Sequence, residues 1–340
     1  MPTMVDVAKR AGVALSTVSY ALNGTRPISE ETRQRIYAAM EELGYKPHAL
    51  ARGLASKRSK IIALLFPTPE RGLGLTELEF VTSAAEAARN KGYHLVLWSL
   101  PTDSSELRQL LQQGLVDGVL VMEVHLNDPR IELLRELEFP FSMIGRCAES
   151  TGMSYVDIDF DRTTQLAVNC LAELGHRQIG FINHSHEAFE AGYGPTVRVA
   201  QRFNEAIAAA QLHGVSSFCH DSVAAGYETF NQLLTDHPAL SGLIVMNERA
   251  IPGIIQAVSE RGWSIPDDIS LISLVSSARV AEMTLPTLTT LEPPIAELGA
   301  LGVDLLIQQL EAQDRELPQA LLPCQLVVRG STGQARRTER

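Results

Sequence analysis

The sequence predicts an α/β protein in which a small all-α unit precedes a core of two doubly wound parallel sheets. Three observations lead to this class. The first sixty residues contain short helical patterns and no strand pattern. From residue 61 onwards, short apolar runs alternate with amphipathic helical runs, which is typical of parallel strands buried on both faces. This alternation occurs in two successive series, which indicates two lobes.

The strand-like runs of the two series are short and nearly continuous in apolar residues. The first series comprises residues 61–66, 94–98, 118–122, 140–144 and 155–158, and the second comprises 178–183, 216–220, 242–246 and 269–274. Amphipathic segments such as 77–91 and 104–113 separate them and are predicted to be helices.

Length and composition exclude several classes of protein. A chain of 340 residues is too long for one ordinary core, and 45% hydrophobic with 20% charged residues is a globular composition. No apolar run reaches the ~18 residues that a membrane span needs, and no export signal begins the chain. The four cysteines form no CxxC pair, so we expect buried free thiols in the cytoplasm, no metal and no cofactor.

Charge is distributed unevenly along the chain. The formal net charge is -11, which by itself disfavours nucleic acid as a partner. Residues 1–60 nevertheless hold ten of the 29 Lys and Arg but only five of the 40 Asp and Glu, a net of +5, and the other residues carry -16. A basic head on an acidic body is expected of a protein that contacts phosphate with one end only.

Residues 3–24 are predicted to form two short helices joined by a tight turn. Thr3 and Asp6 have the spacing of a capping box, and Gly12 can take the positive φ that ends a helix. The second helix, from Leu15 to Asn23, presents polar side chains with no core to fill: Ser16, Thr17, Ser19 and Tyr20. This is how a helix-turn-helix offers its second helix to a DNA major groove, although an ordinary αα-hairpin has the same periodicity.

A third helix and a linker follow. Ser29 is expected to cap the helix and Gly44 to end it. Five side chains should fill the small three-helix core: Ile36, Tyr37, Met40, Leu43 and Tyr45. Residues 47–56 fit either a flexible tether or a marginal helix, since Gly53 weakens a helix by ~1 kcal/mol.

The head resembles that of the lactose-repressor (LacI/GalR) family of bacterial transcription regulators. The motifs that carry the resemblance are Val5–Val13, Ser16–Ser19, Leu22–Gly24, Ser29–Arg33 and Leu43–Pro47, and it runs to about residue 330. It implies a cytoplasmic homodimer that represses a carbohydrate-utilisation operon by binding pseudo-palindromic double-stranded DNA. On the operator it would be nucleoid-associated, and a small effector, a sugar or sugar derivative, would control it.

The resemblance also implies how the chain is divided. We expect a DNA-binding headpiece at 1–46, a hinge at 47–60, a periplasmic-binding-protein-like core at 61–330 and a polar, disordered tail at 331–340. The N-lobe would comprise 61–160 and 291–322, and the C-lobe 161–290 and 323–330, so that the chain crosses between lobes three times.

Family positions that contact DNA are carried over to six residues of the headpiece: Leu15, Ser16, Thr17, Ser19, Tyr20 and Arg26. Leu15 offers only apolar contact, whereas Tyr20 can donate to or accept from a base edge. The resemblance further implies that Leu54, in the hinge, acts as a wedge in the minor groove.

The effector is expected in the cleft between the lobes, at the carboxyl ends of the strands. Candidate ligands follow strand ends or lie on the helix after the sixth strand: Glu123, Arg146, Asp159, Arg198, Asn247 and Glu248. Taken alone, each of these residues is also explained as a solvated charge on a loop. Two departures weaken the sugar expectation, because Val275 stands where many relatives have Asp and Val199 where they have a ligand-binding Arg.

Enzyme motifs are lacking. The sequence has no GxSxG, P-loop or GxGxxG, and we interpret the His184–Glu187 stretch as surface rather than as metal ligands. The alternative to a regulator is a sugar-binding protein or enzyme whose basic head has no operator role. Salt-dependent binding to palindromic DNA distinguishes the two.

Overall fold

The computed structural model describes residues 2–23, 26–45, 58–67, 72–100, 104–311 and 318–336. In the headpiece, three helices pack around a small core. They are α1 (Met4–Ala11), α2 (Leu15–Asn23) and α3 (Glu30–Leu43). The predicted capping box at Thr3 and Asp6 is confirmed, and Gly12 ends α1 at φ 63°.

The headpiece core contains four of the five predicted side chains, Ile36, Met40, Leu43 and Tyr45, together with residues of α1 and α2. Val7, Val18 and Ile36 are completely buried in it. Tyr45 packs against this core, but the prediction for Tyr37 is wrong, because its side chain is 48% exposed. Tyr37 directly follows the buried Ile36 on α3, and adjacent helical residues point to different sides.

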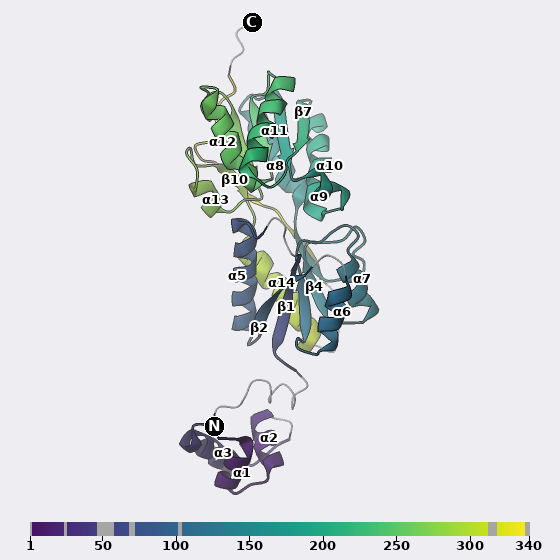
Figure 1. Ribbon diagram of the computed structural model, residues 1–340, viewed down its shortest axis with the longest axis vertical. Helices are drawn as coiled ribbons and strands as arrows, with labels where there is room; N and C mark the ends of the chain where they lie inside the picture. The colour runs from purple at the N-terminus through teal and green to yellow at the C-terminus, as the bar shows by residue number, and fades with distance from the viewer. Residues whose placement is uncertain are drawn as a thin grey trace.

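Two lobes lie beyond the headpiece (Figure 1). The N-lobe contains β1 (Ile61–Pro67), α5 (Leu75–Asn90), β2 (His94–Leu100), α6 (Ser105–Gln112), β3 (Gly118–Val121), α7 (Pro129–Glu136), β4 (Phe141–Ile144), β5 (Tyr155–Ile158), α14 (Ile295–Glu311) and β11 (Gln319–Leu322). Its sheet has the order β11-β5-β4-β3-β1-β2, and every pair is parallel.

The C-lobe repeats this design. It contains α8 (Phe160–Glu173), β6 (Gln178–Asn183), α9 (His186–Glu190), α10 (Gly194–Ala209), β7 (His213–Phe218), α11 (Val223–Asp236), β8 (Gly242–Val245), the 3₁₀ turn η1 (Glu248–Ala250), α12 (Ile251–Glu260), β9 (Ser270–Leu274), α13 (Ala278–Glu282), β10 (Thr289–Glu292) and β12 (Gln325–Val327). The sheet order is β12-β10-β9-β8-β6-β7, with only β12 antiparallel to its neighbour.

Three segments pass between the lobes. They follow β5, β10 and β11, so β11 completes the N-lobe sheet and β12 returns to the C-lobe sheet. A continuous cluster of buried apolar side chains joins the lobes, extending from Phe66 through Phe160 to Phe181. The two sheets therefore share one core at their carboxyl ends, where ligands of such sheets bind.

The C-terminal tail corrects a prediction, because residues 331–336 are ordered. Ser331 is completely buried, accepts a hydrogen bond from the Thr289 amide at 2.7 Å and donates to the Leu271 carbonyl. The buried His176 lies near the Gly333 carbonyl, and its pKa is lowered by burial. A polar sequence can pack when its hydrogen bonds are satisfied by buried backbone groups.

Candidate functional site

The exposed face of α2 carries the predicted DNA contacts. Leu15 is 47% exposed and Ser16 is exposed, while Thr17, Ser19 and Tyr20 are half-buried. The exposed Arg26 stacks its guanidinium on the Tyr20 ring, 5.3 Å from the ring centroid. The face therefore combines hydroxyl groups, one apolar contact and one cation. The predicted wedge, Leu54, lies outside the described residues.

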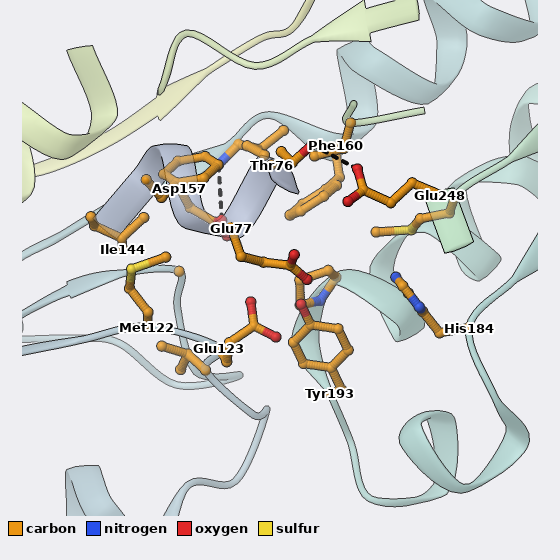
Figure 2. Close-up of a pocket in the computed structure, with 17 residues that line it drawn as sticks. Thr76, Glu77, Met122, Glu123, Ile144, Asp157, Phe160, His184, Tyr193 and Glu248 are labelled. Atoms are coloured by element: carbon orange, nitrogen blue, oxygen red, sulfur yellow. Dashed lines mark hydrogen bonds between the residues drawn. The ribbon is translucent and has the colours of Figure 1, made fainter. Parts of the chain in front are cut away.

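A cavity of about 100 Å³ lies between the lobes, at the carboxyl ends of both sheets (Figure 2). Side chains of the N-lobe line one side and those of the C-lobe the other. The N-lobe contributes Thr76, Glu77, Phe80, Met122, Glu123, Val124, Ile144, Gly145, Asp157 and Ile158, and the C-lobe contributes Phe160, His184, Tyr193, Pro195, Met246, Glu248 and Val275.

The six predicted effector residues do not all reach this cavity. Glu123 and Glu248 line it, whereas Arg146 and Arg198 line an adjoining cavity of about 430 Å³. Asp159 lines neither, because its carboxylate accepts the Arg162 amide at the start of α8. Asn247 also lines neither and is buried, donating to the Cys219 carbonyl.

Asp157 takes the place that sequence reasoning gave to Asp159. Its side chain is 6% exposed, and its Oδ2 lies 3.3 Å from Arg146 Nε and 4.0 Å from Arg198 Nη1. Burial raises the pKa of Asp157 to about 6, against the opposing effect of the two guanidinium groups. Asp157 therefore separates the first cavity from the arginines that line the second.

A buried ion pair holds the backbone that carries Glu123. Arg130 and Asp128 form two contacts of 2.9 and 2.7 Å, and their side chains are 1% and 0% exposed. The same guanidinium donates to the carbonyls of Met122 and Glu123, at 3.2 and 2.9 Å. Glu123 has φ 53°, a left-handed conformation that non-glycine residues rarely adopt, so these bonds maintain the turn that aims it at the cavity.

Polar contacts at the start of α5 join the two lobes directly. The Glu248 carboxylate accepts a hydrogen bond from the Leu75 amide at 3.1 Å. It also accepts one from Thr76 Oγ1 at 2.7 Å, which Figure 2 shows. Arg249 donates to the Gly72 carbonyl at 2.8 Å, and the Ser277 amide donates to Thr76 Oγ1. Glu248 thus caps a helix of the other lobe, where a negative charge is favourable.

The remaining cavity residues were not predicted, and one prediction is wrong. His184 was interpreted as surface, but its side chain is 13% exposed, lies 3.2 Å from Asp221 and lines the cavity. Val275 contributes an apolar wall and has φ 56°. Among the described residues, no group of three or more His, Cys, Asp and Glu is arranged to hold a metal ion.

The linker enters the N-lobe through a charged anchor. The Asp117 carboxylate accepts the amides of Ser59 and Lys60, at 2.6 and 2.8 Å. Lys60 also pairs with Glu311 at 2.8 Å, at the end of α14. The helix α14 starts where the chain passes between the lobes after β10, and it ends beside Lys60. It therefore connects the region between the lobes with the linker.

The headpiece and the two-lobed core with an interlobe cavity define a class of regulator that joins a helix-turn-helix to a ligand-binding body. Residues 3–48 match the lacI family of bacterial regulatory proteins, and residues 168–332 match a periplasmic binding protein-like domain. The HTH-type transcriptional repressor PurR of Klebsiella pneumoniae (strain 342) is 31% identical over 316 residues, covering 91% of each chain.

Solved structures agree over the whole length. The complex of the transcriptional regulator CelR with cellobiose is 26% identical, with a TM-score of 0.72, over 97% of this chain and 100% of that one. The lac repressor dimer bound to operator and the anti-inducer ONPF is 24% identical, with a TM-score of 0.83, over 98% and 99%, and shows the same fold. The chain belongs to the LacI family of bacterial transcription regulators.

The relatives are transcription regulators. None of the helices in the described parts of the chain is long and apolar enough to cross a bilayer. The three cysteines Cys147, Cys219 and Cys324 are buried free thiols, while Cys170 is only partly buried.

Proposed function

We propose that this regulator acts as a cytoplasmic homodimer that represses transcription by binding a pseudo-palindromic operator through two headpieces. The observation that carries this proposal is the outward face of α2, where Leu15, Ser16 and the stacked Tyr20–Arg26 pair are presented away from the buried Val18. Two headpieces related by a two-fold axis would read the two half-sites.

Binding to a palindromic duplex at increasing salt tests the operator role. A dimer that neutralises several phosphates should lose orders of magnitude in affinity between about 50 and 200 mM salt. Tyr20→Ala should reduce the preference for the operator over a scrambled duplex by about 1–3 kcal/mol. Tyr37→Ala is the matched control, since Tyr37 lies exposed on α3, and it should leave both quantities unchanged.

The hinge residue is tested separately. Leu54→Ala should weaken binding to an operator with a central flexible step and should leave binding to an isolated half-site unchanged. Footprints that are identical for wild type, Tyr20→Ala and Leu54→Ala would contradict the assignment of both residues. A protein that ignores duplex DNA at low salt would instead fit a small-molecule binding protein.

We further propose that the interlobe cavity binds the effector and that the relative position of the lobes is the regulated quantity. Glu248, Arg249 and Ser277 of the C-lobe bond to the start of α5 in the N-lobe, so a ligand between them changes the balance of lobe arrangements. The CelR complex holds cellobiose, which supports a carbohydrate effector and a carbohydrate-utilisation operon as the regulated target.

A thermal-shift screen against sugars, sugar phosphates and purines tests the effector proposal, because a ligand that binds the native state raises its melting temperature. The reciprocal experiment is decisive for control. If the ligand alters operator affinity by some factor, operator DNA must alter ligand affinity by the same factor. Ligand binding without any effect on operator affinity would refute the regulatory role of the cavity.

A further inference from the structure

A short antiparallel bridge of backbone joins the two lobes beside the interlobe cavity. The Leu126 amide of the N-lobe donates to the Gly192 carbonyl of the C-lobe at 2.7 Å, and the Gly194 amide donates to the Val124 carbonyl at 3.1 Å. Tyr193, which lies between the two glycines, is one of the side chains that line the cavity (Figure 2). We call this pair of segments the interlobe bridge: residues 124–126 and 192–194.

Glycines allow the two backbones of the bridge to approach each other. Gly192 has φ 74°, in the left-handed region that favours glycine. A Cβ atom on Gly194 would lie 2.8 Å from the Val124 carbonyl oxygen, which is too close for two atoms that are not bonded. The residues at both positions therefore suit a backbone contact between the lobes, and a side chain at Gly194 would push the bridge apart.

Arg198 holds the same side of the cavity, one turn further along α10. Its guanidinium donates to the Arg146 carbonyl at 2.8 Å and to the Cys147 carbonyl at 3.2 Å, in the N-lobe loop after β4. Its side chain is only 14% exposed, so little water competes for these bonds. Glu248 and Arg249 join the lobes at the start of α5, and Figure 1 shows α5 and α9 at opposite edges of the contact between the lobes. The cavity is therefore enclosed by interlobe bonds on both sides.

The cavity enclosed by these bonds is small. Its volume is about 100 Å³, whereas pockets that bind small molecules usually measure about 300–1,000 Å³. Its walls are the ends of two packed sheets, and packed protein interiors deform little. Rotation of side chains cannot lengthen the backbone bonds of the bridge. A ligand of sugar size therefore needs the lobes to move apart, and the interlobe bridge has to break for that movement.

We propose that the interlobe bridge is a latch that keeps the cavity closed, and that a ligand of sugar size binds only when this latch is open. The inference rests on the proposed function of the cavity as the effector site and adds the direction of the lobe movement. The apparent affinity of the effector is reduced by the fraction of molecules whose latch is closed. Weakening the latch therefore strengthens effector binding, whereas a ligand clamped between closed lobes would lose affinity.

Access to the cavity is measured first, with iodoacetamide as the probe. Met246 lines the cavity and is 7% exposed, so Met246→Cys places a thiol on the cavity wall. Mass spectrometry on the full chain follows alkylation at position 246 separately from that of the native cysteines. In this background, Gly194→Ala should raise the alkylation rate about five- to tenfold, the factor expected for the loss of one backbone hydrogen bond. An unchanged rate overturns the proposal.

Two further variants identify the bridge as the cause. Leu126→Pro removes the amide that donates to Gly192 and should accelerate alkylation as Gly194→Ala does. Gly214→Ala is the matched control, because its Cβ would clash with the Ile207 side chain within the C-lobe, at the amino end of β7. It should leave the rate unchanged, and circular dichroism confirms that each variant is folded. Equal acceleration in Gly214→Ala overturns the proposal, since general loosening of the C-lobe would then explain the effect.

Calorimetry with glucose and cellobiose then tests the direction of the movement. A sugar that binds should bind Gly194→Ala about five- to tenfold more tightly than the wild type, and Gly214→Ala as tightly as the wild type. Equal or weaker binding by Gly194→Ala overturns the latch and leaves the cavity as the effector site. Faster alkylation in Gly194→Ala, without binding of either sugar to any form, supports the latch and instead removes the carbohydrate effector from the proposed function.

Discussion

Removal of the buried Arg130 guanidinium should strongly destabilise the N-lobe. Arg130→Met keeps most of the aliphatic volume but leaves Asp128, whose side chain is 0% exposed, without its cation. It also removes the donor to the Met122 and Glu123 carbonyls. Breaking a buried pair by removing one partner costs about 3–5 kcal/mol, so we expect a loss of that size in the free energy of unfolding of the N-lobe.

Urea unfolding followed by the fluorescence of Trp98, which packs in the N-lobe, measures this loss. Arg108→Met is the matched control, since Arg108 pairs with Glu136 at 2.9 Å in the same lobe but both side chains are well exposed. That pair should contribute less than about 1 kcal/mol. A loss below about 1 kcal/mol in Arg130→Met would refute the inference that the buried pair maintains the lobe.

The pH dependence gives a second measurement of the same pair. The Arg130 hydrogen bonds hold the pKa of Asp128 well below its ordinary value of 3.8, despite the opposing effect of burial. A carboxyl group whose pKa is lower in the folded state than in the unfolded state stabilises the fold at pH values above its unfolded-state pKa. This contribution is lost as pH falls through its folded-state pKa. In Arg130→Met, burial would raise that pKa, so the stability gap to wild type should narrow as pH falls from 7 towards 4.

Three further predictions concern other parts of the core. Burial raises the pKa of Asp157 in the folded state to about 6, so the free energy of unfolding of the wild type should fall by at most about 3 kcal/mol as pH rises from 4 to 7. Denaturant titrations of Asp157→Asn should lack this decrease with pH. Gly253→Ala on α12 should cost about 1–3 kcal/mol or more in thermal unfolding, since its Cβ would clash with the Val223 carbonyl, whereas Ser259→Ala on the exposed face should change little. Asp117→Asn should weaken operator binding in a fluorescence titration and leave effector affinity unchanged, because it loosens only the linker anchor; equal changes in both affinities would contradict that role.

Much of the fold follows from local patterns. Strands such as Tyr155–Ile158 and Gln178–Asn183 have the predicted bounds, because near-continuous apolar runs between helices identify buried parallel strands. β7 begins three residues earlier than predicted, at His213 instead of residue 216, since it is an edge strand with alternating exposure and a polar start. The short strands Thr289–Glu292 and Gln319–Leu322 were not predicted, because four residues carry little periodic signal.

The cavity was harder to predict than the sheets. Positions after strand ends correctly indicated Glu123 and Glu248, since parallel strands end at one edge of a sheet. Asp159 was chosen instead of Asp157 because it directly follows the strand, whereas Asp157 lies within β5, and the structure shows that the Asp159 carboxylate caps α8 instead. Glu77 lies on an amphipathic helix, where a charge normally indicates a solvated face. Its role in the cavity depends on the docking of the lobes, which no local pattern encodes.

The chain passes between the two lobes three times, and this path has a consequence for biosynthesis. A nascent chain can fold its headpiece as soon as the first few dozen residues leave the ribosome, but the N-lobe sheet receives its edge strand β11 only at Gln319–Leu322. The helix α14, which lies against α5, is also made late, at Ile295–Glu311. A ribosome that stalls before residue 295 would therefore release a DNA-reading head attached to a body lacking part of both lobes.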